Sequence, residues 1–295
     1  MFSFFKYYFR KNVDIGSIDA SLHIEIDKLP KKIGIIAGNS NFPVRVAELA
    51  KIHGFKTIVL AHEGETPDEI NNFSDELLVV KLGELDKSIR FFKNHDVENV
   101  VFAGGINRIK GFDSLKPDSR AAALLLKIRS TKDDHLMRGI ASELHFEGIN
   151  VLPCTLFMNN DSISKSVITM NNPDQESLND IEVGRQSIHA MSDLHIGQTV
   201  AIKDGVVIAV EAVEGTDRMI QRIGDLRIKG ATVVKLTKKN QDLRFDIPTV
   251  GIKTIELLHQ SNVKTLALEA GRSIILDKDH FIELANKYKI AVIGI

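Results

Sequence analysis

The amino-acid sequence predicts an α/β protein with a parallel sheet in its first half and a mixed sheet in its second half. Short apolar runs alternate with amphipathic stretches from residue 32 to residue 153, and an Asp204-Gly205 pair separates two apolar runs in the second half. An Asn-, Asp- and Ser-rich stretch at 159–177 lies between the halves. Alternating strands and helices favour a parallel sheet, whereas Asp-Gly between apolar runs favours an antiparallel hairpin.

The first half opens with an apolar run at 32–37, a loop that starts at Gly38, and helical apolar spacing at 43–52. Such a strand, loop and helix form the first unit of a Rossmann-like domain. The pattern then repeats as far as residue 153. The further elements that we expect in this half are strands at 57–61, 77–81, 100–103 and 149–153 and helices at 85–92, 119–129 and 133–146.

The second half is expected to begin with a helix at 178–191 and a hairpin of two strands, 198–202 and 206–210. The Asp-Gly pair at its turn suits the backbone conformation that tight hairpins require. The elements that we expect after the hairpin are a helix at 217–228, a strand at 232–236, a long loop, a helix at 253–260 and strands at 266–269, 273–276 and 291–293.

These elements divide the chain into four parts: an N-terminal extension at 1–31, a Rossmann-like domain at 32–158, a linker at 159–177 and a mixed-sheet domain at 178–295. A length of 295 residues with 43% hydrophobic residues is sufficient for two cores. The extension carries six aromatic residues among its first nine, followed by Arg10 and Lys11. A segment of this kind can lie on a membrane surface, although a disordered tail or a start codon placed too far upstream explains it equally well.

The charge balance argues against nucleic acid as a partner, because 38 Lys and Arg residues face 39 Asp and Glu residues. The single cysteine, Cys154, has no second cysteine with which to form an internal disulfide. No apolar run approaches the roughly 18 residues that cross a bilayer, and no secretory signal pattern is present. We therefore expect a cytoplasmic protein.

Two glycine loops of the first half are candidate ligand-binding segments. Gly38 follows the first strand and precedes a helix start, where free N–H groups and the helix dipole favour an anion. Gly104 and Gly105 follow Phe102 and Ala103 at the end of another strand, and ligands of parallel sheets bind beyond such strand ends. Neither loop has the dinucleotide fingerprint or a Walker A sequence, and plain strand-ending turns remain an alternative explanation.

A turn in the second half concentrates oxygen ligands. Glu211, Glu214 and Asp217 supply three carboxylates, and Thr216 supplies a hydroxyl, between a strand and a helix. Magnesium binds one or two carboxylates together with water and substrate phosphate oxygens, so this turn is a candidate metal site. An ordinary helix start capped by Thr216 is the alternative.

A second polar group follows the next strand. Lys235 ends that strand, and Asp242, Arg244 and Asp246 lie close together in the loop after it. A carboxylate can bind a metal or orient an attacking water, while Lys and Arg can stabilise charge on phosphoryl oxygens. A salt-bridged surface strand would show the same alternation of charges.

The order of several motifs resembles one family, the UDP-2,3-diacylglucosamine pyrophosphatases of bacteria that lack the calcineurin-like phosphoesterase for the same step of lipid A biosynthesis. The match runs from about residue 32 to the C-terminus, and the first 31 residues have no counterpart. The motifs that carry the resemblance are Ile33-Gly-Ile-Ile-Ala-Gly38 with Phe42-Pro43, Ala103-Gly-Gly105, Asp133-Asp134, Ile196-Gly-Gln198, Glu211-Ala-Val-Glu-Gly-Thr-Asp217, Gln241-Asp-Leu-Arg-Phe-Asp-Ile-Pro-Thr-Val-Gly251 and Glu269-Ala-Gly-Arg272.

The resemblance implies hydrolysis of the sugar nucleotide to UMP and 2,3-diacylglucosamine 1-phosphate, with Mg²⁺ or another divalent cation as the cofactor and the second domain as the catalytic one. It implies that Asp246 is the essential carboxylate, which binds the metal or orients water. Glu214 and Asp217 would complete the metal site, and Asp217, Lys235 and Arg244 would assist catalysis. The residues that would contact the substrate are Gly38, Phe102, Ala103, Gly104, Gly105, Asp133, Thr199, Thr216 and Asp217.

The resemblance also implies UDP-2,3-diacylglucosamine as the partner molecule, makes transient contact with the inner-membrane surface plausible, and is compatible with a homodimer. Two departures concern His195, which stands where the family usually has an acidic residue, and the loop after Gly38, which usually has more glycine. From the residues alone, a nucleotide- or dinucleotide-binding oxidoreductase and a non-catalytic lipid carrier remain the alternative functions.

Overall fold

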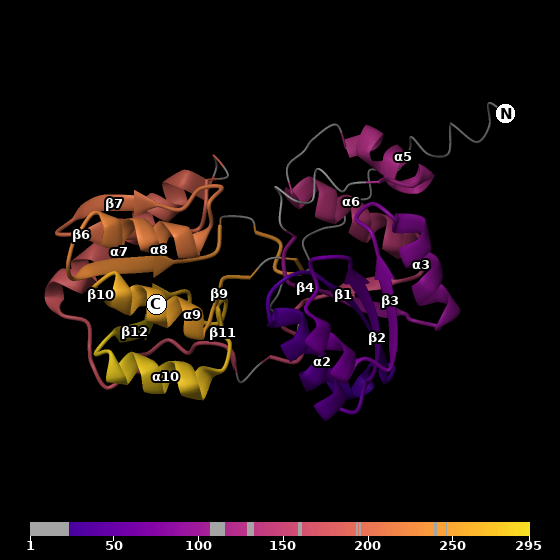
Figure 1. Ribbon diagram of the computed structural model, residues 1–295, viewed down its shortest axis with the longest axis horizontal. Helices are drawn as coiled ribbons and strands as arrows, with labels where there is room; N and C mark the ends of the chain where they lie inside the picture. Colours follow the sequence, from indigo (N-terminus) through magenta and orange to yellow (C-terminus); the bar gives the residue numbers. More distant parts are fainter. Residues whose placement is uncertain are drawn as a thin grey trace.

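The structure is a computed structural model that describes residues 24–106, 116–128, 133–158, 161–192, 194, 196–238, 241–245 and 247–295, with the side chains of 133 and 134 excepted. It confirms the expected α/β class: the N-terminal part holds a parallel sheet and the C-terminal part a mixed sheet (Figure 1). The two parts lie side by side, and the chain crosses between them more than once.

The N-terminal sheet has five strands in the order β3-β2-β1-β4-β5, and all neighbours are parallel. The chain runs from β1 outward to β2 and β3, then returns to place β4 on the other side of β1. The direction of winding therefore changes between β1 and β4, where ligands of such sheets bind. The strands are β1 (Lys32–Ala37), β2 (Lys56–His62), β3 (Glu76–Val80), β4 (Asn99–Ala103) and β5 (Asn150–Leu152).

Helices cover both faces of this sheet. Helix α2 (Phe42–Ile52) buries Val46, Ala47 and Ala50 against one face, together with the apolar side chains of β1. Helices α3 (Leu85–Asn94) and α6 (Asp133–Phe146) cover the other face, and α5 (Ser119–Ile128) packs against both of them. Two short 3-10 helices complete this part: η1 (Ile26–Lys28) and η2 (Asp68–Phe73).

The C-terminal sheet has the order β12-β10-β8-β6-β7. Strand β6 is antiparallel to both β7 and β8, whereas β8, β10 and β12 are parallel to one another. The hairpin predicted at Asp204-Gly205 is confirmed, since both residues have positive φ between β6 and β7. The strands are β6 (Thr199–Lys203), β7 (Val206–Val210), β8 (Ala231–Lys235), β10 (Val263–Leu268) and β12 (Ala291–Gly294).

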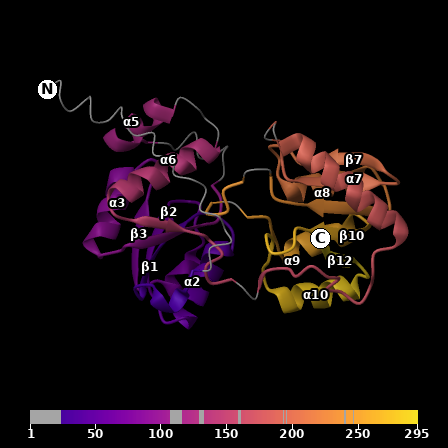
Figure 2. The same ribbon diagram turned by 180° about the vertical axis from the view of Figure 1, so that it is seen from behind.

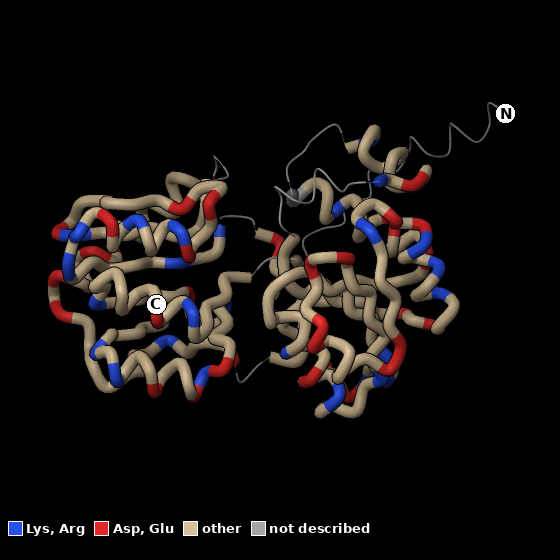
Figure 3. Tube along the Cα trace, viewed as in Figure 1, with Lys and Arg blue, Asp and Glu red and all other residues tan. Residues whose placement is uncertain are grey.

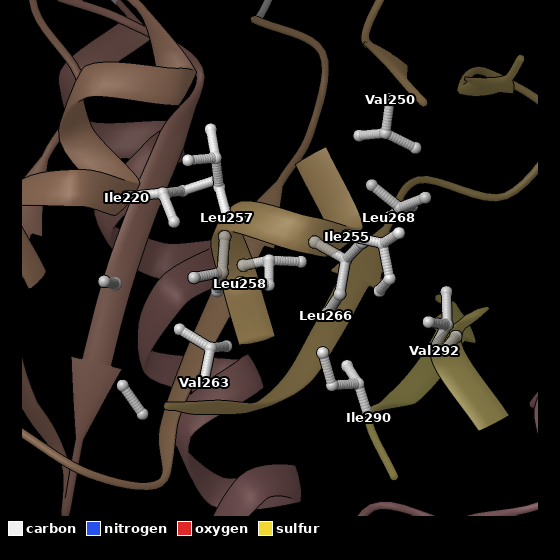
Figure 4. Packing of buried hydrophobic residues seen from close by; sticks show 14 of the residues in the cluster. Ile220, Val250, Ile255, Leu257, Leu258, Val263, Leu266, Leu268, Ile290 and Val292 are labelled. Carbon is white, nitrogen blue, oxygen red and sulfur yellow. The ribbon is translucent and has the colours of Figure 1, made fainter. Parts of the chain in front are cut away.

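Helix α7 (Gln175–Ser192) covers one face of this sheet (Figure 2). Its Gly184 allows close contact with the side chains of Val234 and Ile202. Helices α8 (Thr216–Asp225), α9 (Ile252–Gln260) and α10 (Lys278–Lys287) cover the other face. Their aliphatic side chains interlock with those of β8, β10 and β12, as Figure 4 shows for Leu258, Leu266 and Val292. Burial of these side chains supplies most of the driving force for folding this part.

Several elements of the C-terminal part differ from the predictions. Helix α10 was not predicted, and the predicted strand at 273–276 is only β11 (Ile274–Ile275), which pairs with β9 (Thr249–Val250) in a separate two-stranded sheet. Helix α8 ends at Asp225 instead of residue 228, because Arg227 adopts a left-handed conformation (φ 55) that an α-helix cannot contain.

In the polar stretch between the halves, Asp161 pairs with Arg45 of α2, whereas the next described residues lie against the C-terminal part. Ser162 and Val167 form isolated bridges with Ile274 and Ile293, and Ile163 is buried in the core formed with α8, α9 and α10. Lys, Arg, Asp and Glu are interspersed along both halves (Figure 3). Among the described residues, no helix has the length and apolar character needed to cross a membrane.

Candidate functional site

Three predicted site residues meet at one end of the C-terminal sheet. Thr199, at the start of β6, lies opposite Lys235, at the end of β8, in the antiparallel register. Thr216 begins α8, and its hydroxyl accepts a hydrogen bond of 2.9 Å from the Lys235 ammonium. The hydroxyl oxygens of Thr199 and Thr216 are 3.3 Å apart. The fold therefore brings Lys235, Thr199 and Thr216 into one cluster, although they are distant in sequence.

Glu211, which follows β7, completes this cluster. One of its carboxylate oxygens accepts a hydrogen bond of 2.9 Å from the Thr216 hydroxyl, and the other accepts one of 3.2 Å from the Gln198 backbone N–H. The carboxylate is almost fully enclosed, since Glu211 is only 9% exposed. Sequence analysis named Glu211 only as part of a carboxylate-rich turn and did not distinguish it from Glu214 and Asp217.

The cluster carries a buried positive charge. Lys235 is 7% exposed, and among the described residues its ammonium contacts only the neutral Thr216 hydroxyl, so that two of its three N–H groups are left for other acceptors. Gly215 caps α8 without a side-chain hydrogen bond, which leaves backbone N–H groups at the positive end of the helix dipole. A buried ammonium beside a free helix start is an arrangement suited to a phosphoryl group.

Glu214 and Asp217, the predicted metal ligands, flank this helix start. Asp217 forms an ion pair of 2.7 Å with Lys253, whose side chain is largely exposed. One oxygen of Glu214 lies 3.1 Å from an Arg222 nitrogen, but the geometry is not that of a hydrogen bond, and this buried oxygen has no hydrogen-bond partner. A carboxylate oxygen without a hydrogen-bond partner is suited to binding magnesium. The described residues contain no group of three or more His, Cys, Asp or Glu side chains that could hold a metal by themselves.

Arg244, the other predicted catalytic cation, is buried against Asp242. Its guanidinium donates two hydrogen bonds to the Asp242 carboxylate, of 2.9 and 2.7 Å, and each residue is 5% exposed. Burial opposes ionisation of Asp242, but the hydrogen bonds and charge of Arg244 hold the pKa of this carboxyl below its ordinary value, with further help from Arg138. Among the described residues, Arg244 is therefore paired with Asp242 and lies over the Phe245 ring, and none of these contacts is with Lys235.

We expect Asp242→Asn to lower the free energy of unfolding by about 3 kcal/mol at pH 7, since Arg244 would keep a buried charge without a counter-charge. Because the folded-state pKa is depressed, the stabilisation is present above the unfolded-state pKa of about 3.9 and is lost as the pH falls through the folded-state value. Urea unfolding of both proteins between pH 3 and pH 7 measures this difference, which should shrink in acid.

The matched control for this substitution is Asp204→Asn, which breaks an ion pair of 2.7 Å between Lys203 and an aspartate whose side chain is 66% exposed. That change should alter the free energy of unfolding by less than about 0.5 kcal/mol. Equal stability of the Asp242 variant and the original protein at pH 7 would contradict the assignment of the Asp242–Arg244 pair as a stabilising contact.

The segment around this ion pair packs onto the N-terminal part of the protein. The Phe245 ring meets the Phe102 ring edge-on at 5.3 Å, and Arg138 of α6 lies 3.6 Å from Asp242. Ile247 joins the core on the α2 face of the N-terminal sheet, whereas Phe245 joins the core on its opposite face. The loop after β8 therefore links the cluster at Lys235 to the end of β4. Asp246, the predicted essential carboxylate, lies outside the described residues.

The two predicted glycine loops contact each other through their backbones. The Gly38 N–H donates a hydrogen bond of 2.8 Å to the Ala103 carbonyl, and the Asn39 N–H donates one of 2.7 Å to the Gly105 carbonyl. A Cβ atom on Gly38 would lie 2.2 Å from the Gly105 oxygen, and one on Gly104 would lie 2.3 Å from the Asn39 oxygen. Glycine is required at Gly38 and Gly104 by this close approach.

The structure thus gathers the predicted residues into two groups. Lys235, Thr199 and Thr216 form one group, with Glu214 and Asp217 beside it. The second group consists of Gly38, Phe102, Ala103, Gly104 and Gly105, at the point where the N-terminal sheet changes its direction of winding. Asp133 begins α6, but its side chain lies outside the described part of the chain.

Two of the solved structures that the chain resembles are distant likenesses. The crystal structure of gox2253 aligns with 10% identity over 88% of this chain and 76% of that chain, with a TM-score of 0.32. The biotin carboxylase domain of the Hydrogenobacter thermophilus 2-oxoglutarate carboxylase aligns with 10% identity over 66% of this chain and 40% of that chain, with a TM-score of 0.28. Likenesses this weak carry no argument about function.

Comparison of sequences is more informative. The protein named UDP-2,3-diacylglucosamine pyrophosphatase LpxI from Caulobacter vibrioides is 29% identical over 282 residues, which are 90% of this chain and 98% of that protein. The LpxI N-terminal domain matches residues 32–160, and the LpxI C-terminal domain matches residues 164–293. Together these two domains account for most of the sequence, in the order in which the family has them. The chain therefore belongs to the LpxI family.

Proposed function

We propose that this protein is a metal-dependent hydrolase that splits the pyrophosphate of UDP-2,3-diacylglucosamine into UMP and 2,3-diacylglucosamine 1-phosphate in lipid A biosynthesis. The relative from Caulobacter vibrioides carries the name of this activity, and the matched region spans nearly the whole of both chains. The observation of the structure that carries the proposal is the buried Lys235 ammonium beside the uncapped start of α8, because such a site suits a phosphoryl group.

The chemistry requires one water molecule. Its oxygen forms a bond to one phosphorus atom, the bond from that phosphorus to the bridging oxygen breaks, and the bridging oxygen leaves with the other phosphate. Lys235, together with the N–H groups of α8, would stabilise the negative charge that develops on the phosphoryl oxygens. Thr199 and Thr216 would supply the neutral contacts around the same oxygens.

A divalent cation, Mg²⁺ in our proposal, would be held by Glu214, Asp217 and Asp246. When bound, it would act as a Lewis acid toward the phosphoryl oxygens. Among the described residues, the ion-pair partners of Glu214 and Asp217 are the half-exposed Arg222 and the exposed Lys253. This supports the ligand set, since neither carboxylate is locked into a buried ion pair. In this scheme Asp246 binds the cation or orients the attacking water.

The second group of residues would receive the lipid portion of the substrate. Gly38 and the segment 102–105 lie at the sheet position where ligands bind in related folds, and Asp133 would contribute from the start of α6. Since the substrate has two acyl chains, transient contact with the inner-membrane surface forms part of the proposal. We further propose domains at 32–158 and 178–295. The stretch predicted to link them, 159–177, contains the start of α7, and its Ile163 is buried in the C-terminal core.

The test is release of UMP from UDP-2,3-diacylglucosamine by the purified protein. We expect release in the presence of Mg²⁺, a fall of at least about tenfold after chelation, and recovery when Mg²⁺ is restored. Absence of UMP release with every divalent cation tested would contradict the proposal and would favour a lipid carrier or an oxidoreductase instead. A thermal shift with NAD or NADP would then favour the oxidoreductase.

A further inference from the structure

We infer that Glu211 is a positioning residue that fixes the Lys235 ammonium through the hydroxyl of Thr216. This inference rests on the proposed function, because it concerns the phosphoryl site of the same reaction. The inference rests on three groups: the carboxylate of Glu211, the hydroxyl of Thr216 and the buried ammonium of Lys235.

The directions of the hydrogen bonds follow from the chemistry of the groups. An ionised carboxylate only accepts, so the single Thr216 hydroxyl proton is donated to Glu211 across 2.9 Å. An ammonium only donates, so Lys235 donates a hydrogen bond to the Thr216 oxygen, also across 2.9 Å. Thr199 must likewise donate if it bonds to Thr216. Glu211 therefore turns the oxygen lone pairs of Thr216 toward Lys235.

The carboxylate itself is held in place from both sides. Its second oxygen accepts the Gln198 N–H, and the Glu211 backbone N–H donates to the Thr199 carbonyl across 2.9 Å. Gly197 packs directly on the Glu211 main chain, since a Cβ atom there would lie 2.3 Å from the Glu211 carbonyl oxygen. The Ile196-Gly-Gln198 motif and the turn at 211–217 thus lie in direct contact, which explains why residue 197 is a glycine.

The arrangement separates the two charges by one hydroxyl group. Glu211 offsets part of the cost of burying the Lys235 charge, yet it takes none of the ammonium N–H groups. A direct ion pair would occupy a donor that a phosphoryl oxygen needs. With Thr216 between them, Lys235 keeps a fixed direction and two donors for the substrate.

Glu211 and Glu214 therefore have different roles, although they lie in the same turn. Both oxygens of Glu211 are engaged by protein donors, whereas one buried oxygen of Glu214 has no hydrogen-bond partner. Glu214 remains a suitable metal donor, and Glu211 does not need to be one.

The test is a double-mutant cycle of Glu211→Gln and Thr216→Val, read by kcat/KM for UMP release and by the dissociation constant of inorganic pyrophosphate. Each single change should lower kcat/KM and raise the pyrophosphate dissociation constant about tenfold. Glu211→Gln removes the charge and replaces one of two acceptor oxygens by a donor, and Thr216→Val removes the hydroxyl that accepts from Lys235. The double variant should have about the same kcat/KM and the same pyrophosphate dissociation constant as either single variant, because the two changes interrupt one chain of contacts. Thr216→Ser retains the hydroxyl, so its kcat/KM and its pyrophosphate dissociation constant should stay within about threefold of those of the original protein.

The matched control is Asp180→Asn. Asp180 is also a buried carboxylate of the C-terminal part, 1% exposed, and accepts a hydrogen bond of 2.8 Å from the Gly205 N–H on the β6–β7 turn. Its substitution should lower thermal stability as much as Glu211→Gln does, but change pyrophosphate binding and kcat/KM less than about twofold.

Independent effects that multiply to about a hundredfold in the double variant would overturn the inference. So would a Glu211→Gln protein that binds pyrophosphate as tightly as the original. Failure of the proposed function is recognised separately: the original protein would release no UMP, while the cycle for pyrophosphate binding would still decide the role of Glu211.

Discussion

Replacement of Asp246 by alanine should lower the rate of UMP release at least about a thousandfold, while binding of UDP-2,3-diacylglucosamine stays within about threefold. In the proposed reaction this carboxylate binds the cation or orients the attacking water, and both contributions arise mainly in the transition state. An interaction of that kind appears in kcat and much less in substrate affinity. The measurement is single-turnover UMP release alongside equilibrium binding of the substrate to the inactive variant.

The fold should tolerate this change, because the chain on either side of Asp246 is held by other side chains. Phe245 packs edge-on against Phe102, and Ile247 is buried in the core on the α2 face of the N-terminal sheet. The Asp242–Arg244 pair holds the same loop a few residues earlier. The thermal midpoint of Asp246→Ala should therefore differ from that of the original protein by no more than about 2 °C.

The comparison variant is Asp242→Asn, which alters an aspartate of the same loop but destabilises the protein. If Asp246 acts in the chemistry, the Asp246 variant is stable and inactive, whereas the Asp242 variant is less stable and keeps measurable turnover. An Asp246→Ala protein with more than a third of the original kcat would remove Asp246 from the metal site and leave Glu214 and Asp217 as its only candidates.

The fold class was predictable because the strands of a covered parallel sheet are continuous apolar runs, as in β1 and β4. Helix α10 was not predicted, although Phe281, Ile282, Leu284 and Ala285 have the apolar spacing of a helix and pack on the core. Strand β9 has two residues and is too short to show any periodicity, and β11 is shorter than the strand predicted at 273–276. The two strands pair with each other, and that pairing depends on chain packing rather than on local sequence.

The candidate site was predictable only in part. Lys235, Thr199 and Thr216 were named from the resemblance and the motifs, but their meeting depends on the antiparallel register of β6 and β8. The glycine loops were interpreted as ligand contacts, and their mutual backbone hydrogen bonds became visible only in the fold. The separate role of Glu211 could not be inferred from a turn with three carboxylates, because residue type does not reveal which oxygens are already engaged.

Lys235→Met should lower kcat/KM for UMP release between about 100-fold and 1,000-fold, which is the usual cost of removing one donor that stabilises charge on reacting oxygens. Methionine has a similar length and no charge, so the change removes the ammonium with little change in packing. Steady-state UMP release measures the effect. Lys229→Met, at an exposed position just before β8, is the control and should change kcat/KM less than about twofold.

The same variant should lose no stability when no substrate is present. Lys235 is 7% exposed and has no ion-pair partner among the described residues, so its charge is buried at a cost that the Thr216 hydroxyl offsets only in part. If Lys235 is retained for its charge in binding or catalysis, the Lys235→Met protein should therefore unfold at the same temperature as the original protein or higher, and turn over far more slowly. A variant that unfolds earlier but keeps its kcat/KM would instead show that Lys235 serves the fold, and the phosphoryl site would have to be sought elsewhere on the chain.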